Sequence, residues 1–364
     1  MQGTVRETEH VQDQRTRELK AQSHQAEAIL QSMTEAVVAI DASGRILWLN
    51  DSAQRLIGAR SDQTVGNRLT ELMRHQELDE LIRRALRDRR SISAELRLFT
   101  PAEQVVRMQA TPLEAEVGET ALVLVAQDVT EVRRLEGLRR EFVANVSHEL
   151  KTPLTSIAGL VETLLGGALE DPANNRRFVS LIEKETSRLT HLIDDLLQLS
   201  QVESRAVPLK LQPVDVPALM REAWGDVERQ AAARRMSVSW ELAGSLPKIP
   251  GDIERLRQVF VNLFDNAIKF NQDGGRITVR GRVDGWMLVV EVEDTGIGIP
   301  EPDLARIFER FYRVDKARSR EQGGTGLGLA IAKHIIELHQ GRIEARSRLG
   351  HGAILSVSLP ISSS

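Results

Sequence analysis

A long amphipathic pattern between residues 130 and 203 places the strongest limit on how this chain folds. In its first half, apolar residues recur three and four positions apart, which is the spacing of one buried face of an α-helix. In its second half they alternate four and three apart, as in a coiled-coil seam, interrupted by one charge at Glu185. Between the halves, Gly166 and Gly167 are helix stop signals, and Pro172 suits the first turn of the next helix. The segment therefore predicts two long helices joined as a hairpin.

Each of these helices carries an apolar face that a two-helix hairpin cannot bury by itself. An antiparallel four-helix bundle buries both faces, so we expect a homodimer formed through the hairpin. Pro153 lies inside the first helix, where it removes one hydrogen bond and should kink the helix. The first face comprises Leu135, Leu138, Phe142, Val146, Leu150, Leu154, Ile157, Val161 and Leu164, and the second comprises Phe178, Ile182, Leu189, Leu192, Leu196 and Leu199.

One histidine of the first helix lies off its apolar face. His148 stands in the segment V-S-H-E-L-K-T-P, two residues from both Val146 and Leu150. Two residues correspond to roughly 200° around a helix, so the imidazole should point toward solvent. A neutral, exposed imidazole can act as a nucleophile.

The residues before the hairpin alternate between strand and helix patterns. β-rich runs at 36–40 and 45–50 flank the turn D-A-S-G and predict a β-hairpin. Helical patterns follow at 50–58 and 76–86, and three more strands are expected at Ala94–Leu98, Val105–Pro112 and Thr120–Asp128. His75 is the only histidine between residues 28 and 130, and haem ligation is one interpretation of it. A surface histidine before a helix is better supported, because nothing nearby specifies a haem pocket.

The residues after the hairpin predict one layered α/β domain. A linker, P-V-D-V-P, separates this domain from the hairpin. Helices and strands alternate beyond it. The expected helices are Ala218–Arg235, Asp252–Phe270 and Thr325–His339, and the expected strands are Ser237–Leu242, Arg276–Arg282, Met287–Glu293, Arg342–Ala345 and Ile354–Leu359.

Composition excludes several classes of function. The 48 basic and 52 acidic residues are scattered, and the net charge of −4 gives no basis for a nucleic-acid partner. The absence of cysteine excludes disulfides, zinc–thiolate sites, thiol catalysis and cysteinyl-flavin photochemistry. No apolar run approaches the roughly 18 residues that span a bilayer. The sequence as written therefore predicts a cytoplasmic protein, although a membrane anchor removed from before the polar segment 1–27 remains an alternative.

Asn262, Asn266 and Lys269 share one face of a predicted helix, in the segment N-L-F-D-N-A-I-K-F. Two neutral amides bind Mg²⁺ weakly, which suits a metal that arrives with a triphosphate and keeps phosphate oxygens as ligands. For this spacing alone, an ordinary polar helix face is the better supported interpretation.

Two glycine-rich segments follow. Asp294 ends an apolar strand and precedes Gly296 and Gly298 in D-T-G-I-G-I-P. An ionised carboxylate can accept a hydrogen bond from the exocyclic amine of adenine, and glycine lets a ligand approach the backbone. Taken alone, the segment is as typical of a tight turn as it is of a binding site. In G-G-T-G-L-G-L, Gly324, Gly326 and Gly328 begin a predicted helix, where free N–H groups favour phosphate, but their spacing matches neither a Rossmann nor a P-loop motif.

In this order and context, the motifs resemble those of two-component sensor histidine kinases, over residues 130–360. The segments G-D-I-E-R-L-R-Q-V-F-V-N-L and R-S-R-E-Q-G-G-T-G-L-G-L-A-I look most like the phosphate-regulon sensor group. Residues 28–130, which end in the D-V-T of Asp128 to Thr130, resemble a PAS sensor domain. The resemblance implies a multidomain α+β protein with an α/β sandwich of the histidine kinase, gyrase and chaperone type. The expected domains are a linker helix at 1–27, a PAS domain at 28–130, a dimerisation and phosphotransfer hairpin at 131–205 and an ATP-binding domain at 212–361.

The same resemblance assigns roles to residues of this chain. His148 would be the phosphoacceptor, Glu149 the neighbouring base and Thr152 the residue that assists phosphatase action. Asn262 and Asn266 would bind Mg²⁺. Phe270 stands where the family commonly has tyrosine, so a hydrogen bond from that hydroxyl is absent. The expected nucleotide contacts are Asn262, Asn266, Lys269, Phe270, Asp294, Gly296, Gly298, Gly324, Thr325, Gly326, Leu327 and Gly328, with a mobile lid over F-E-R-F-Y-R that includes Phe308, Arg310 and Arg313.

The implied activity is autophosphorylation of His148 from Mg-ATP, followed by transfer to an aspartate on the receiver domain of a response regulator. Dephosphorylation of that regulator is a second expected activity. Two alternatives remain open: an ATPase of the same nucleotide fold without phosphohistidine chemistry, and a dimeric signalling scaffold without kinase activity. An unknown small ligand or protein at the PAS domain, the stimulus, and transfer within or between protomers are also left open.

Overall fold

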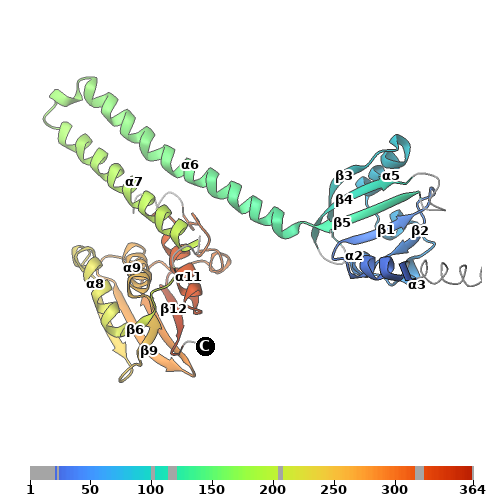
Figure 1. Cartoon of the computed structure of the whole chain (residues 1–364). Helices are drawn as coiled ribbons and strands as arrows, with labels where there is room; N and C mark the ends of the chain where they lie inside the picture. The colour runs from blue at the N-terminus through green and yellow to red at the C-terminus, as the bar shows by residue number, and fades with distance from the viewer. Residues whose placement is uncertain are drawn as a thin grey trace, which may run out of the picture. The chain divides into compact units, whose positions relative to one another are not determined.

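The computed structural model describes residues 21–22, 24–99, 103–113, 121–203, 208–315 and 324–362. The chain divides into two compact units, residues 1–141 and 142–364 (Figure 1). Each unit contains a five-stranded sheet and its own hydrophobic core. Most of the linker helix expected at residues 1–27 lies outside the described residues, and the structure is helical at residues 24–32.

The first unit is built on an antiparallel sheet with the strand order β2-β1-β5-β4-β3. All five strands and the two longer helices were predicted, and no end differs from its predicted position by more than two residues. Two four-residue helices, α3 and α4, were not predicted, because so short a segment carries no helical periodicity. The elements are β1 (Ala36–Ile40), β2 (Ile46–Leu49), α2 (Asp51–Ile57), α3 (Ser61–Thr64), α4 (Leu69–Leu72), α5 (Gln76–Asp88), β3 (Ile92–Leu98), β4 (Gln104–Pro112) and β5 (Leu122–Asp128).

The end of β5 is tied to the start of the next helix by side-chain hydrogen bonds. The hydroxyl of Thr130 donates to Asp128 and accepts from the backbone N–H of Val105, at 2.5 and 2.8 Å. Arg133, one turn into the helix, pairs with Glu95 of β3. These contacts join the first residues of the helix to the sheet of the first unit.

The hairpin consists of α6 (Thr130–Leu165) and α7 (Asn175–Glu203), joined through a short 3₁₀ turn, η1 (Ala168–Glu170). Pro153 lies inside α6, as predicted. The expectation for Pro172 was wrong: it lies in the turn three residues before α7, where Asp171 organises the chain by accepting from Ala173 N–H at 3.0 Å. Several residues of the predicted α6 face are exposed in the single chain, among them Leu135, Leu138, Leu154 and Val161. Two leucines outside the predicted faces, Leu165 of α6 and Leu197 of α7, are exposed as well.

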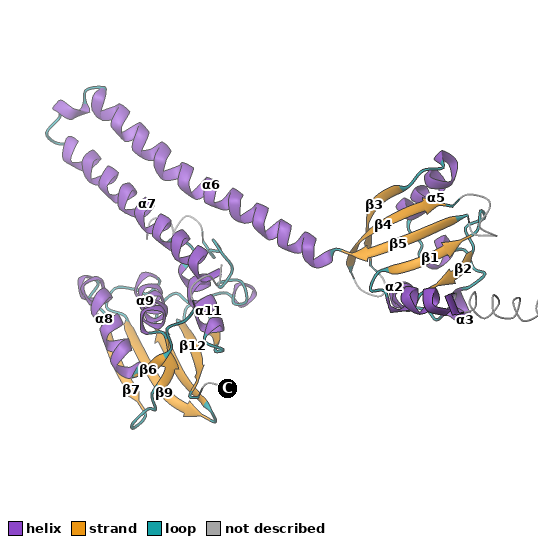
Figure 2. Cartoon of the chain, viewed as in Figure 1, coloured by secondary structure: helices purple, strands orange, loops and turns teal. Residues whose placement is uncertain are grey.

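The remainder of the second unit places three helices over one face of a sheet (Figure 2). The sheet has the order β11-β12-β10-β9-β7; β7 and β9 are parallel, and the other pairs are antiparallel. Phe260 and Phe264 of α9 are fully buried between the layers. The elements are α8 (Val216–Ala233), β7 (Ser237–Leu242), α9 (Ile253–Lys269), β9 (Arg276–Asp284), β10 (Met287–Asp294), the 3₁₀ turn η2 (Glu301–Asp303), α11 (Gly328–Leu338), β11 (Arg342–Ser347) and β12 (Ala353–Pro360).

Two features of this layered domain were not predicted correctly. A small sheet of β6 (Gln212–Val214) and β8 (Ile249–Gly251) was missed, because both strands have three residues and each contains a proline. The last helix was expected from Thr325, but α11 begins at Gly328. Gly326 has a φ of +74°, a left-handed conformation that interrupts a helix, so Gly324 to Leu327 form a loop.

A buried histidine joins the end of α11 to the start of α9. His339, which follows α11, accepts from the backbone N–H of Asp252 through Nε2 at 3.0 Å. Its Nδ1–H therefore donates to the carbonyl of Ile335 at 2.8 Å. Asp252 is the N-cap of α9 and also accepts from Lys210 N–H at 3.0 Å. Burial lowers the pKa of His339, which keeps the ring neutral and able to accept.

Candidate functional site

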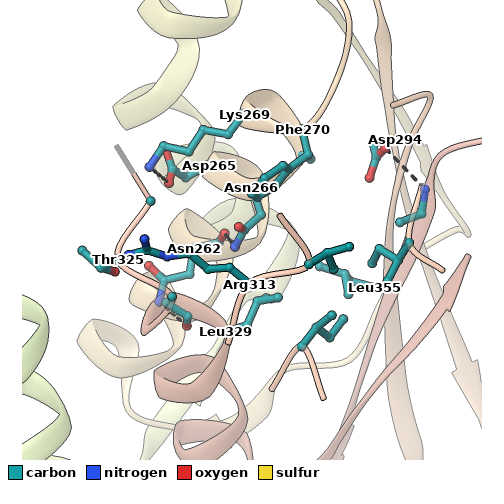
Figure 3. A pocket seen from close by; sticks show the side chains of 18 of the residues that line it. Asn262, Asp265, Asn266, Lys269, Phe270, Asp294, Arg313, Thr325, Leu329 and Leu355 are labelled. Carbon is teal, nitrogen blue, oxygen red and sulfur yellow. Dashed lines mark hydrogen bonds and ion pairs between the residues drawn. The ribbon is translucent and has the colours of Figure 1, made fainter. Parts of the chain in front are cut away.

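A cavity of about 540 Å³ opens between α9, the end of β10 and the loop before α11. Its lining contains most of the residues that the motifs singled out, although they lie up to 66 positions apart in the sequence. Asp294 lies across the cavity from Asn262, Lys269 and Thr325 (Figure 3). The cavity therefore has one end with a carboxylate and another end with amides, an ammonium group and a glycine-rich loop.

The amide-bearing face of α9 lines the second end. The Asn262 side chain is buried; its Oδ1 accepts from Gln258 and its Nδ2 donates to the carbonyl of Gly328, both at 2.9 Å. Asn266 donates from Nδ2 to the carbonyl of Asn262 at 2.8 Å. Among the described residues nothing donates to Asn266 Oδ1, so this oxygen suits a cation better than Asn262 Oδ1 does.

Lys269 extends the same face by one turn. Its Nζ lies 2.6 Å from Asp265 Oδ2, and both side chains are about a quarter exposed. An ammonium group paired with a single carboxylate keeps donor capacity for a phosphate oxygen. Asp265 was not singled out in the sequence, yet it sets the position of Lys269 in this structure.

Asp294 closes the opposite end of the cavity. Its Oδ1 accepts from Gly296 N–H at 2.8 Å and from Ala353 N–H at 3.3 Å, which leaves Oδ2 for a ligand. Burial raises the pKa of Asp294 to about 6, and the two backbone hydrogen bonds act in the opposite direction. A largely desolvated acceptor beside apolar side chains such as Ile297 and Leu355 suits a nucleobase amine.

Three of the glycines are required by the backbone itself. A Cβ on Gly296 would lie 2.3 Å from the carbonyl oxygen of Phe270, and one on Gly298 would lie 2.2 Å from that of Arg348. Gly326 combines its positive φ with a Cβ position 2.9 Å from the backbone of Phe311. Gly328 differs, because its Cβ would make only ordinary contact with Asn262, at 3.5 Å. Close approach of a ligand is the remaining reason for glycine at that position.

The remaining predicted contacts have different surroundings. Phe270 and Gly324 line the cavity, together with Arg313. Phe308 packs against the hydrophobic core, and Leu327 is fully buried within it. The Arg310 guanidinium lies 5.5 Å from the Phe142 ring centroid on α6. The expected lid, residues 308–313, lies within the described part of the chain, and its mobility stays a prediction.

His148, the predicted phosphoacceptor, is exposed on α6. Its side chain is 65% exposed, as its position off the apolar face predicted. Glu149 follows it, with Oε1 3.9 Å from His148 Nδ1. Its Oε2 lies 3.1 Å from Arg313 and 3.5 Å from Arg188 of α7. The carboxylate therefore lies between the imidazole and two guanidinium groups, one of them from the nucleotide-binding domain.

Thr152 makes a local hydrogen bond within α6. Its hydroxyl donates to the carbonyl of His148 at 3.1 Å. Helical threonines commonly make this bond to the preceding turn. This bond gives Thr152 a structural role in the helix, and a role in dephosphorylation stays a prediction.

The α7 arm contributes side chains to the cavity that the motifs did not indicate. The lining includes His191, Asp194, Asp195 and Gln198. Asp195 accepts from the Thr325 hydroxyl at 2.6 Å. Beside this contact, Leu192 and Leu199 are buried against the layered domain. In this structure the nucleotide-binding domain is thus docked on α7, and His148 does not line the cavity.

Comparison with known proteins agrees with this arrangement. The family model of the histidine kinase-, DNA gyrase B- and HSP90-like ATPases matches residues 251–363. The His Kinase A (phospho-acceptor) domain matches residues 138–205, and the PAS fold matches residues 30–134. The phosphate regulon sensor protein PhoR of Pseudomonas aeruginosa is 35% identical over 322 residues, which cover 88% of this chain and 71% of PhoR.

The chain belongs to the sensor histidine kinases. It combines a PAS domain, a phosphoacceptor hairpin and an ATP-binding domain, and its class is the ATP-dependent protein-histidine kinases of two-component systems. The family and fold-class predictions are confirmed.

Other relatives extend the comparison. The sensor protein kinase WalK of Staphylococcus saprophyticus is 33% identical over 347 residues, and these cover 94% of this chain but 56% of WalK. The chain thus spans about half the length of that relative. The structure of histidine kinase ThkA in complex with response regulator protein TrrA shares the fold, with a TM-score of 0.51 at 23% identity over 92% of this chain and 98% of that one. In the described part of the chain, no helix is both long and apolar enough to cross a membrane.

Proposed function

We propose that this kinase transfers the γ-phosphoryl group of ATP to His148 and then to an aspartate on the receiver domain of a response regulator. One observation carries the proposal: an exposed imidazole with an adjacent carboxylate belongs to the same compact unit as a cavity suited to ATP. The cavity pairs a buried acceptor, Asp294, with an amide and ammonium end at Asn266 and Lys269.

The geometry beside His148 supports a separate role for each ring nitrogen. Nδ1 is the nitrogen that faces Glu149, so Nε2 is free to attack phosphorus. As the Nε2–P bond forms, the bond from phosphorus to the bridging oxygen of ADP breaks, and Glu149 stabilises or accepts the Nδ1 proton. A positioned base of this kind contributes about 10²- to 10⁴-fold to rate.

The donor set also fits Mg²⁺ that arrives with ATP. Asn266 Oδ1 would hold the ion together with Asn262 Oδ1, which already accepts a hydrogen bond from Gln258. When bound, the ion neutralises charge on the phosphates. Lys269 and the N–H groups of the loop from Gly324 to Gly328 would stabilise charge as it develops on the transferred group.

Release from α7 has to precede the transfer. Glu149 is engaged by Arg313, and the loop residue Thr325 is bonded to Asp195. Both contacts must break before the cavity can approach His148.

The partners belong to the same proposal. A second copy of the chain would cover the exposed apolar residues of α6 and α7, which supports the homodimer. A response regulator would dock at the exposed face of His148, as the complex of ThkA with TrrA suggests by analogy. Residues 28–130 would receive an unidentified ligand or protein signal, and the kinase chemistry would take place in the cytoplasm, where ATP is available, with or without a membrane anchor.

Radiolabelling tests the transfer. Wild type incubated with γ-labelled ATP and Mg²⁺ should gain label that is stable to alkali and labile to acid, and His148→Ala should gain none while it still binds ATP. ATP turnover without labelling would favour the ATPase alternative. Absence of ATP binding would favour the scaffold.

A further inference from the structure

Asp195 connects the hairpin to the loop that precedes α11. It lies on α7, and its Oδ2 accepts from Thr325 Oγ1 at 2.6 Å. The same Thr325 oxygen accepts from Leu327 N–H at 3.3 Å. One carboxylate of α7 therefore holds the conformation of a loop that lines the cavity.

Asp195 lies close enough to Lys269, at the amide and ammonium end of the cavity, to interact with it electrostatically. Burial raises the pKa of Asp195, and the Thr325 hydrogen bond and the charges of Lys269 and His191 oppose that increase. Asp265 adds a second negative charge nearby. Lys269, the proposed phosphate contact, is thus close enough to act on Asp195, and phosphate oxygens bound at Lys269 would act on it as well.

We propose that Asp195 makes the docked catalytic domain discriminate against a nucleoside triphosphate relative to a diphosphate. This inference rests on the proposed ATP site. A triphosphate brings one more charged phosphate into a partly desolvated space that already contains the Asp195 carboxylate, and like charges repel strongly there. A diphosphate leaves the Asp195–Thr325 hydrogen bond undisturbed.

Thermodynamic linkage couples this nucleotide discrimination to docking on α7. If docking on α7 weakens triphosphate binding by some factor, triphosphate binding weakens docking by the same factor. ATP would then release the catalytic domain toward His148, and ADP would leave it docked. Couplings of this kind commonly amount to about 5- to 150-fold.

The alternative is that Asp195 only fastens Thr325. Asp195→Asn separates the two roles, because an asparagine oxygen still accepts from the Thr325 hydroxyl while the charge is gone. Glu183→Gln is the matched control, since Glu183 is an exposed acid on the same helix that does not line the cavity.

The test compares two nucleotides by calorimetry in the full chain, with Mg²⁺ present. We expect Asp195→Asn to bind the non-hydrolysable triphosphate AMP-PNP about tenfold more tightly than wild type does. ADP affinity should change by less than about twofold in the same variant, and Glu183→Gln should match wild type with both nucleotides. An unchanged ratio of AMP-PNP to ADP affinity in Asp195→Asn would overturn the inference and leave the proposed function standing. Failure of wild type to bind either nucleotide would overturn both.

A distance measurement provides the readout for docking. The chain contains no cysteine, so nitroxide labels can be placed at Ser200→Cys on α7 and Lys333→Cys on α11 without background. With labelled chain diluted in unlabelled chain, AMP-PNP should lengthen the distance in wild type, and ADP should not. In Asp195→Asn both nucleotides should leave the short distance in place. A triphosphate response as large as that of wild type would show that the charge of Asp195 is not the cause.

Discussion

His339 should make the stability of the ATP-binding domain depend on pH near neutrality. The ring has to be neutral in the folded protein, because Nε2 accepts from Asp252 N–H while Nδ1–H donates to Ile335. Protonation would place an N–H⁺ against the Asp252 N–H and charge a buried ring. Because Asp252 caps α9 and binds Lys210 N–H, the loss would extend to the helix that carries Asn262 and Asn266.

The sign follows from the lowered pKa of His339. Between the pKa of the folded state and the unfolded value of about 6.5, the unfolded chain binds more protons, so the free energy of unfolding decreases as pH falls. The contribution is complete above about pH 6.5 and is lost at about 1.4 kcal/mol per pH unit between the two pKa values. Asp294 acts in the opposite direction, because its pKa is raised to about 6 and the folded state takes up its proton first.

Comparison of variants at each pH isolates the His339 contribution. We expect His339→Gln to lower the free energy of unfolding at pH 7.5 by about 1 to 3 kcal/mol, the usual cost when a buried hydrogen-bonding group loses its partner. The difference between wild type and variant should shrink as pH falls from 7 to 5, while contributions from Asp294 cancel.

The measurement is urea unfolding monitored by circular dichroism at several pH values. His351→Gln is the control, because His351 is an exposed histidine of the same domain. A difference between wild type and His339→Gln that stays constant from pH 7 to 5 would refute the assignment of a neutral, hydrogen-bonded ring.

Three further predictions concern the site. Asn266→Ala should weaken Mg-ATP binding at least tenfold in calorimetry, since it removes the freer amide oxygen, and should leave the dimer intact by light scattering; unchanged affinity would count against the metal site. ATP affinity should fall about tenfold between pH 7 and 5, because Asp294 must be ionised to accept from adenine and its pKa is about 6. Asp294→Asn should abolish this pH dependence, and a pH dependence that persists in the variant would have to come from another group. Thr152→Ala should keep autophosphorylation and phosphotransfer but slow the decay of the phosphorylated regulator in the presence of ADP. Equal decay rates would show that Thr152 has no role in dephosphorylation and only makes its hydrogen bond to His148.

Local patterns predicted most of the elements well. The strand at Ser237–Leu242 matches its predicted bounds, and α9 differs by one residue at each end, because an alternating or amphipathic pattern is visible in the sequence itself. Pattern analysis missed α3, α4, β6 and β8, which are too short to show a period. It placed the start of α11 three residues early, because the positive φ of Gly326 depends on its close approach to Phe311.

The sequence by itself determined the family, through the order of its motifs along the chain. It also determined the exposure of His148 and the shared face of Asn262 and Asn266, because each of these depends on spacing along one helix. Only the tertiary structure decided that Glu149 meets Arg313, 164 residues away, and that Asp195 meets Thr325, 130 residues away. The sequence around each of these four residues does not indicate which distant residue it contacts. The contacts arise where the apolar side chains of α7 pack against the layered domain, and that packing depends on the shape of two finished surfaces.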